Sequence, residues 1–216
     1  EGLRNLKKTL RLSSHPYRIE CFDISNIQGK DAVAAMTVAI DGEVTPKEYR
    51  HFKITVKDTP DDLLMMREAL TRRYSKLEID QLPNLILIDG GKGQLGVATE
   101  VLEKLGKIEY TDIISIAKRE EEIFKSYESD PYLFEREDET LKILQRLRDE
   151  AHRFGITHHR KLRSKRNIKS ALDDIDGIGP KRKKELIKRF GTISNIRNAT
   201  MEELMEVIPE KIAEAV

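Results

Sequence analysis

Apolar and polar positions along the first 56 residues predict one helix followed by three strands. The helix is expected to end near His15-Pro16. Its apolar face carries Leu3, Leu6 and Leu10. Apolar-rich runs then predict strands at 17–24, 32–40 and 49–56. A turn at 26–30 and an Asp41-Gly42 hairpin turn separate these strands, which indicates an antiparallel meander.

After residue 58 the pattern changes to alternating helices and apolar strands. A helix is expected to start at Thr59-Pro60-Asp61-Asp62 and to reach about Leu77. Further helices are predicted at 94–105 and 140–154. Short apolar runs predict buried strands at 85–88 and 112–117, and residues 122–127 and 132–136 could form a hairpin. Together these patterns predict an α/β fold, a mixed sheet flanked by helices.

The length of 216 residues allows one medium domain and one small one. We assign residues 1–157 to the α/β domain, 158–169 to a basic linker and 170–216 to a small all-α domain. The sequence does not begin with Met, so we expect it to be a fragment of a longer protein.

The net charge of +1 says nothing about nucleic acid, but the distribution of charge does. The stretch RKLRSKRNIK, residues 160–169, has six basic residues and no acid, which indicates contact with a polyanion. Arg160, Lys161 and Arg163 are therefore candidates for binding DNA phosphates. The alternative is a solvated helix face.

The number of cysteines and the hydropathy of the chain indicate its cellular compartment. The single Cys21 excludes a disulfide within the chain, and no apolar stretch approaches membrane-spanning length. We expect a reducing, cytoplasmic location without membrane contact, and a monomer.

Two carboxylates lie in apolar strand sequence, Asp23 in IECFDIS and Asp89 at the end of LILID. A buried carboxylate is costly unless it is paired or binds a metal. If the two strands are neighbours, both side chains can hold a divalent cation, and oxygen ligands suit Mg²⁺ or Mn²⁺. Taken singly, each Asp could equally be a strand-end cap.

Asp62 and His152 are further candidates for this site. Asp62 lies in the first turn of a predicted helix, where helix capping and the helix dipole also explain an acid. His152, in RDEAHRFG, could reach the mouth of a site beside the core. It could also be a histidine that the dipole stabilises near a helix C-terminus.

The loop GGKGQ at 90–94 follows a buried strand and opens a helix. It is not a Walker loop, because Lys92 is followed by glycine and not by Ser or Thr. Its amides and Lys92 are candidates for holding a phosphate of a nucleic-acid strand.

The segment DIDGIGPKRKK predicts a helix-hairpin-helix turn in the small domain. Its expected phosphate contacts come from Gly177, Ile178, Gly179, Lys181 and Arg182. Such a grip does not read sequence. A second copy without paired glycines follows, with a helix at 196–207 and a turn at 207–209, and its contact with DNA stays open.

Four of these segments together resemble the C-terminal half of the UvrC family: RIECFDISNIQG, LILIDGGKGQL, RDEAHRFGITHHRK and DIDGIGPKRKKELIKRFG. The resemblance implies an RNase H-like endonuclease domain followed by a tandem helix-hairpin-helix domain. It further implies incision of the damaged strand on the 5′ side of a lesion in bacterial nucleotide excision repair. The family's N-terminal nuclease domain and partner-binding segment are expected to lie outside this sequence.

Matched to the family's motifs, Asp23, Asp89 and His152 correspond to its catalytic Asp-Asp-His set, and Asp62 to a further important acid. The resemblance implies duplex or junction DNA as substrate and the repair protein UvrB as partner. Two other functions remain open: a DNA-binding scaffold without catalysis, and a nucleotide hydrolase, which the missing Walker residue disfavours.

Overall fold

The computed structural model describes residues 1–25, 33–55, 61–117, 121–135, 137–173 and 175–216. The side chains of Ser25, His159, residues 161–171 and Asp173 are outside this description. The turn predicted at 26–30 and the predicted helix start at Thr59-Pro60 also lie outside the described residues. The chain forms two compact units, Glu1–Ile156 and Thr157–Val216.

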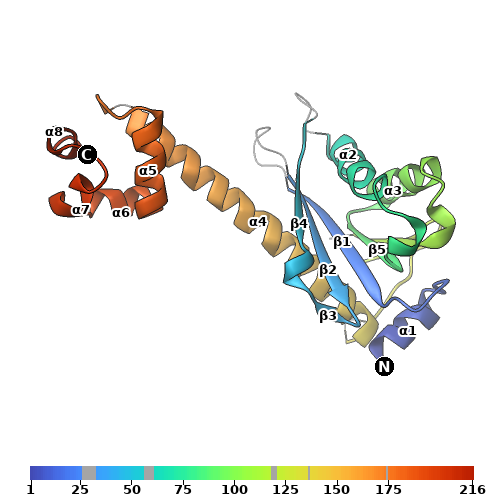
Figure 1. The fold of residues 1–216 in the computed structure, drawn as a ribbon. Helices are drawn as coiled ribbons and strands as arrows, with labels where there is room; N and C mark the ends of the chain where they lie inside the picture. Colours follow the sequence, from blue (N-terminus) through green and yellow to red (C-terminus); the bar gives the residue numbers. More distant parts are fainter. Residues whose placement is uncertain (26–32, 56–60, 118–120, 136, 174) are drawn as a thin grey trace. The chain divides into compact units, whose positions relative to one another are not determined.

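The first unit contains a seven-stranded mixed sheet (Figure 1). Its strands are β1 (Arg18–Ser25), β2 (Val33–Ile40), β3 (Glu43–Val44), β4 (Arg50–Lys53), β5 (Leu85–Asp89), β6 (Asp112–Ile116) and β7 (Ile123–Lys125). The order is β3-β2-β1-β5-β6-β7, and β4 also pairs with β2. β1, β5 and β6 are parallel to one another, whereas the remaining pairs are antiparallel. The predicted mixed α/β sheet is confirmed.

The predicted meander is present with one interruption. Asp41 and Gly42 have φ values of 50° and 82°, the left-handed conformation that a two-residue hairpin turn requires. The strand after this turn is short, because Pro46 starts a 3₁₀ turn, η1 (Pro46–Glu48). The chain then returns to the same side of β2 as β4.

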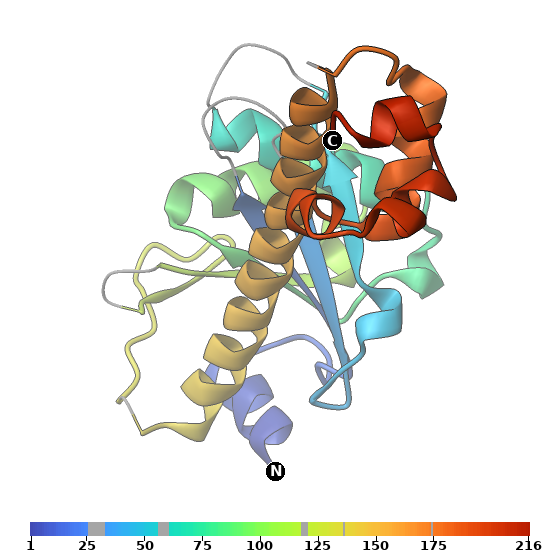
Figure 2. The ribbon, with the colours of Figure 1, turned by 90° about the vertical axis from the view of Figure 1, so that its left-hand side faces the viewer.

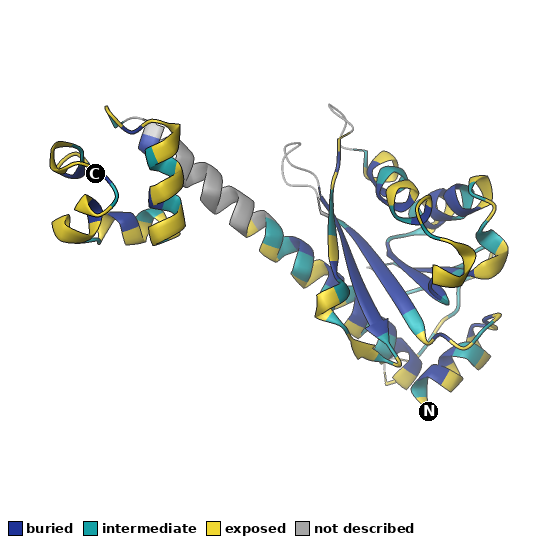
Figure 3. Cartoon of the chain, in the orientation of Figure 1, coloured by how far each residue is buried: buried dark blue, intermediate teal, exposed yellow. Residues whose placement is uncertain are grey.

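Helices cover both faces of the sheet (Figures 1 and 2). α2 (Asp62–Tyr74) and α3 (Lys92–Lys104) pack on one face, and α1 (Gly2–Thr9) and the first part of α4 (Glu139–Asp173) pack on the other. The central strands are buried between the two layers, as the dark ribbon in Figure 3 shows. Short 3₁₀ turns, η2 (Ile79–Gln81) and η3 (Ile108–Tyr110), precede β5 and β6.

Alternation along the central strands divides their side chains between the two faces. Ile19 and Cys21 of β1 and Leu87 of β5 belong to the core beneath α1 and α4. Phe22 and Ile88 belong to the core beneath α2 and α3. Because successive side chains in a strand point to opposite faces, the residue after Phe22 and the residue after Ile88 both face α4.

Helix α4 is longer than predicted. The pattern predicts a helix at 140–154, but α4 runs without a break from Glu139 to Asp173 and contains the segment assigned to a linker, 158–169. Lys and Arg are good helix formers, and no proline interrupts this stretch. The predicted hairpin of 122–127 and 132–136 is also reduced, to β7 and one bridge between Ile123 and Tyr132.

The second unit is all-helical, as predicted. After α4 it contains α5 (Pro180–Phe190), α6 (Ile193–Arg197), α7 (Met201–Met205) and α8 (Glu210–Ala213), packed around a small apolar core. The single helix predicted at 196–207 is wrong. Thr200 caps a new helix there, with its side chain and that of Glu203 forming a capping box.

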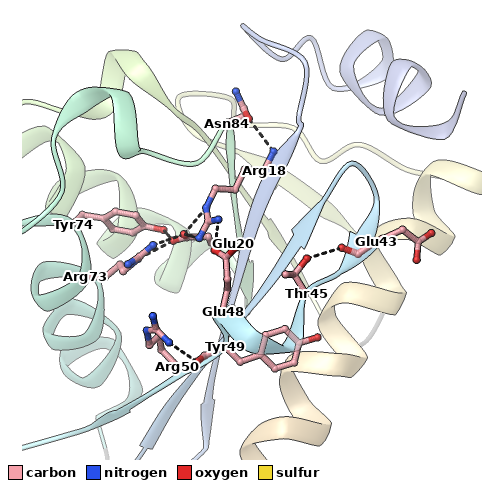
Figure 4. A network of polar contacts seen from close by, with 10 residues as sticks. All are labelled: Arg18, Glu20, Glu43, Thr45, Glu48, Tyr49, Arg50, Arg73, Tyr74 and Asn84. Atoms are coloured by element: carbon pink, nitrogen blue, oxygen red, sulfur yellow. Dashed lines mark hydrogen bonds and ion pairs between the residues drawn. The ribbon is translucent and has the colours of Figure 1, made fainter.

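A network of buried polar groups joins β1 to the α2 layer (Figure 4). The Glu20 carboxylate is fully buried and accepts hydrogen bonds from Arg73 at 2.6 Å, from Arg18 at 2.8 Å and from the Tyr74 hydroxyl at 2.9 Å. Arg18 also forms an ion pair with Glu48. Burial, and then the charge of Glu20, raise the pKa of the Tyr74 hydroxyl well above its usual value.

In the described part of the chain, no helix is long and apolar enough to cross a bilayer.

Candidate metal centre

Asp23 and Asp89 lie side by side toward the carboxyl ends of the central strands β1 and β5. The parallel register of β1 and β5 ends with Phe22 opposite Ile88, and each Asp is the next residue in its strand. Both side chains are buried, with residue exposures of 1% for Asp23 and 6% for Asp89. The expectation that their strands are neighbours is confirmed.

His152 reaches the same place from α4. Its Nδ1 atom lies 3.2 Å from Oδ2 of Asp23, while the imidazole is half-exposed. One atom from each of Asp23, Asp89 and His152 lies within 4.8 Å of the others, which makes this a group that could hold a metal ion. The alternative position for His152, near a helix C-terminus, is wrong because α4 continues to Asp173.

The electrostatics of this group favour a cation. Two carboxylates that approach one another in a buried setting repel unless a positive charge lies between or beside them. Cys21 lies on the same face of β1 as Asp23. Burial, and then the charges of Asp89 and Asp23, raise the pKa of its thiol. The site therefore concentrates negative charge at the surface end of an apolar core.

The ligand types suit a hard or borderline divalent ion. The two carboxylates match the preference of Mg²⁺ and Mn²⁺ for oxygen ligands, and of the two ions Mn²⁺ accepts the imidazole nitrogen more readily. Both carboxylate oxygens of Asp89 are buried, whereas about half of the His152 side chain is exposed. The residues present thus fit the ion that the sequence predicts.

The structure does not bring Asp62 into this group of three. Asp62 is exposed in the first turn of α2, and the preceding residue, Asp61, caps the helix by accepting from the amides of Leu63 and Leu64. Its role as a further catalytic acid stays a prediction.

The glycine loop uses much of its hydrogen-bonding capacity internally. The amide of Gly90 donates to the Ile116 carbonyl, and that of Gly91 donates to the side chain of Gln94. The Lys92 ammonium binds the Ser129 carbonyl at 2.9 Å and lies over the Phe124 ring. Two of the amides expected to cradle a phosphate are thus occupied, and the contact predicted for Lys92 stays a prediction.

The helix-hairpin-helix turn has the backbone that its glycines predict. Gly177 has a φ of +87°, and a Cβ there would lie 2.8 Å from the Ile212 side chain, so this position requires glycine. Gly179 is the N-cap of α5. Ile178 is buried in the core of the second unit, so its side chain does not face a ligand.

The cations predicted to bind phosphate lie in two places. Lys181 is exposed on the first turn of α5, whereas the Arg182 guanidinium donates to the Gly177 carbonyl at 2.6 Å. Lys181 and Arg182 line a depression together with Pro209 of the second hairpin. Arg160 is exposed on α4, and the side chains of Lys161 and Arg163 are outside the described residues.

Comparison with known proteins matches each of the two units to a family model. Residues 7–156 match the model of the UvrC RNase H endonuclease domain. The chain belongs to the UvrC family. Residues 169–216 match the SAM-like helix-hairpin-helix tandem, so the fold is RNase H-like and followed by a helix-hairpin-helix domain.

Two members of the UvrC family are similar in sequence to nearly all of the chain. The UvrABC system protein C of Fusobacterium nucleatum is 59% identical over 99% of the chain, and that of Prosthecochloris aestuarii is 48% identical over 100%. The chain spans 36% and 35% of these two proteins, about a third of their length. Among solved structures, Ciona intestinalis endonuclease V in complex with an inosine-containing DNA is 19% identical, with a TM-score of 0.34 over 62% of the chain and 56% of that chain.

Sequence reasoning missed Glu20, although it lies in the same strand as Asp23 and shows the same signal, a carboxylate in an apolar run. The signal could have found it but could not have assigned its role. Its partners are Arg73 and Tyr74 of α2 and Arg18 of the same strand, so only the packed structure shows that Glu20 is neutralised by arginines.

Proposed function

We propose that this chain carries the endonuclease site of a DNA-repair protein and hydrolyses a phosphodiester bond with the help of Mg²⁺ or Mn²⁺. The observation that carries the proposal is the convergence of Asp23, Asp89 and His152. Membership of the UvrC family supports a substrate in nucleotide excision repair, with the cut on the 5′ side of a lesion.

Asp23 and Asp89 would hold the metal through their carboxylates. When bound, the ion polarises the phosphate, assists formation of hydroxide and stabilises the leaving oxygen. The protein contributes rigidity, because Asp23 lies within β1 and Asp89 ends β5, two buried strands that hydrogen-bond to each other.

His152 would act at the exposed side of the site. Its Nδ1 lies against the Asp23 carboxylate, and this contact orients the imidazole ring. Carboxylates often orient histidines that bind a metal or transfer a proton in this way. Since half of the side chain is exposed, the imidazole can ligate the ion or transfer a proton with solvent.

DNA would be held by the helix-hairpin-helix domain. The exposed Lys181 on the first turn of α5 offers charge to a backbone phosphate, and the N-terminus of the helix adds its dipole. Such contacts position duplex or junction DNA without reading its sequence. The names of the relatives support UvrB as a partner of the longer protein.

A nicking assay on lesion-containing duplex DNA with Mn²⁺ tests the proposal. Asp23→Asn and Asp89→Asn should each abolish nicking while DNA affinity changes little. Asp80→Asn removes the same charge from an exposed position on η2 and should leave nicking intact. Full nicking activity in both site variants would remove these two carboxylates from the mechanism, whereas DNA binding without nicking by the unaltered chain would make the sheet a scaffold for the DNA-binding domain.

A further inference from the structure

A second charged cluster flanks the metal centre, built around Arg148 of α4. Arg148 lies one helical turn before His152, so the two side chains leave neighbouring positions on the helix surface. Its side chain is mostly covered, with 15% exposed, which is unusual for an arginine.

Glu121 holds the Arg148 side chain. One guanidinium nitrogen lies 3.2 Å from the Glu121 carboxylate, and a second lies 2.8 Å from Asp149. Gln145, one turn earlier on α4, donates to the same Glu121 carboxylate. Glu121 therefore receives donors from two successive turns of the helix.

The backbone at Glu121 is in the left-handed region, with a φ of 55°. A non-glycine residue in this conformation is strained, and such strain concentrates at binding sites and switches. The two donors from α4 account for how the strained conformation is kept.

The cluster lies near the carboxyl ends of the parallel strands, where the two acids also lie. β6 pairs with β5 so that Ile116 is opposite Asp89, and the next residue, Ala117, donates its amide to the Glu122 carbonyl. Glu121 thus lies just beyond the strand end that neighbours Asp89.

We propose that Arg148 is a phosphate-binding residue of the nuclease site, and that Glu121 holds it in reserve until a DNA strand replaces the carboxylate. The inference rests on the proposed function, since it takes the ligand to be a DNA phosphate. A planar guanidinium can exchange a carboxylate for a phosphate with little change in geometry, because both offer paired oxygens.

The reserve role and a purely structural role predict opposite results for Glu121→Gln. If Glu121 competes with DNA, its removal frees Arg148 and tightens binding about threefold, whereas Arg148→Gln weakens binding about tenfold. The double variant should then bind like Arg148→Gln alone. If the pair only fixes the loop to the helix, Glu121→Gln weakens binding or leaves it unchanged.

Binding is measured by fluorescence anisotropy on a lesion-containing duplex in EDTA, where no cleavage occurs. Glu122→Gln removes the same charge one residue away, and Arg146→Gln removes a cation of α4 that contacts the Gly42 carbonyl; both should change affinity less than twofold. Arg148→Lys should restore only part of the affinity, because an ammonium lacks the paired donors.

Unfolding midpoints for each variant separate a folding defect from a binding effect. Weaker or unchanged binding by Glu121→Gln with an unchanged midpoint overturns the proposal, and so does unchanged binding by Arg148→Gln. Failure of the proposed function looks different: the unaltered chain would not nick DNA in Mn²⁺, whatever the affinities of these variants in EDTA.

Discussion

Glu20 and Asp23 are buried carboxylates three residues apart on β1, and they face opposite layers of the molecule. Glu20 faces α2 and is enclosed by two arginines and a tyrosine (Figure 4). Asp23 faces α4 and meets a second carboxylate, Asp89, and a histidine. The Glu20 carboxylate is neutralised by arginines of the protein, whereas the group around Asp23 concentrates negative charge.

The difference shows how a buried acid can be assigned to structure or to chemistry. A carboxylate with well-placed cationic partners needs nothing from outside, and removing it leaves those cations without a counter-charge. A pair of carboxylates with one imidazole is more stable when a divalent cation is added. Burial alone does not distinguish the two cases; the partners do.

The largest effect is expected from replacing both acids of the metal centre. In the Asp23→Asn, Asp89→Asn double variant, loss of at least about 4 kcal/mol of transition-state stabilisation reduces nicking by roughly 10³-fold or more, to below detection. Thermal unfolding without metal should occur at the same or a higher temperature, because two like charges are removed. A clear fall in that midpoint would contradict the comparison.

Glu20→Gln should show the reverse behaviour. Breaking the buried ion pairs with Arg18 and Arg73 is expected to cost about 3 kcal/mol of unfolding free energy, measured by urea denaturation. The exposed Glu43→Gln is the control and should cost less than about 0.5 kcal/mol. A Glu20→Gln protein as stable as the control would remove the structural role of the network.

Divalent cations should stabilise only one of the two centres. With Mn²⁺ at ten times its dissociation constant, the unaltered chain should gain about 1.4 kcal/mol of unfolding free energy. Glu20→Gln should gain the same amount, and the double Asn variant should gain none. Isothermal titration with Mn²⁺ checks the stoichiometry, and equal binding by the double variant would place the ion elsewhere.

The smallest effect concerns Tyr74 and pH. Tyr74→Phe should cost about 1 kcal/mol at pH 7 through the lost hydrogen bond to Glu20. The folded pKa of Tyr74 is raised, so its contribution is fully present below the unfolded pKa of about 10 and is lost as the pH rises beyond that value. Urea denaturation at pH 8 and pH 11 should show the two proteins converging, and a constant difference would contradict this assignment.

Much of the sheet follows from the sequence because its strands have simple patterns. The runs ending at Asp89 and at Ala117 are short and apolar, which predicts buried central strands, and Asp41-Gly42 predicts the tight turn that is observed. The helix boundary at Phe154 is wrong because α4 continues through Gly155, although glycine is common just after a helix end. The helix predicted over 196–207 failed because the capping residue Thr200 outweighed the apolar spacing.

By itself, the sequence determined that acids lie in strands that must be buried, and that a glycine-bearing turn joins two helices in the small domain. These are local properties, fixed by side-chain polarity and backbone freedom. Only the tertiary structure decided that Asp23 meets Asp89 and His152 while Glu20 meets Arg73 and Tyr74. Strand register and the packing of helices bring together residues up to 129 positions apart, a relation that local spacing does not contain.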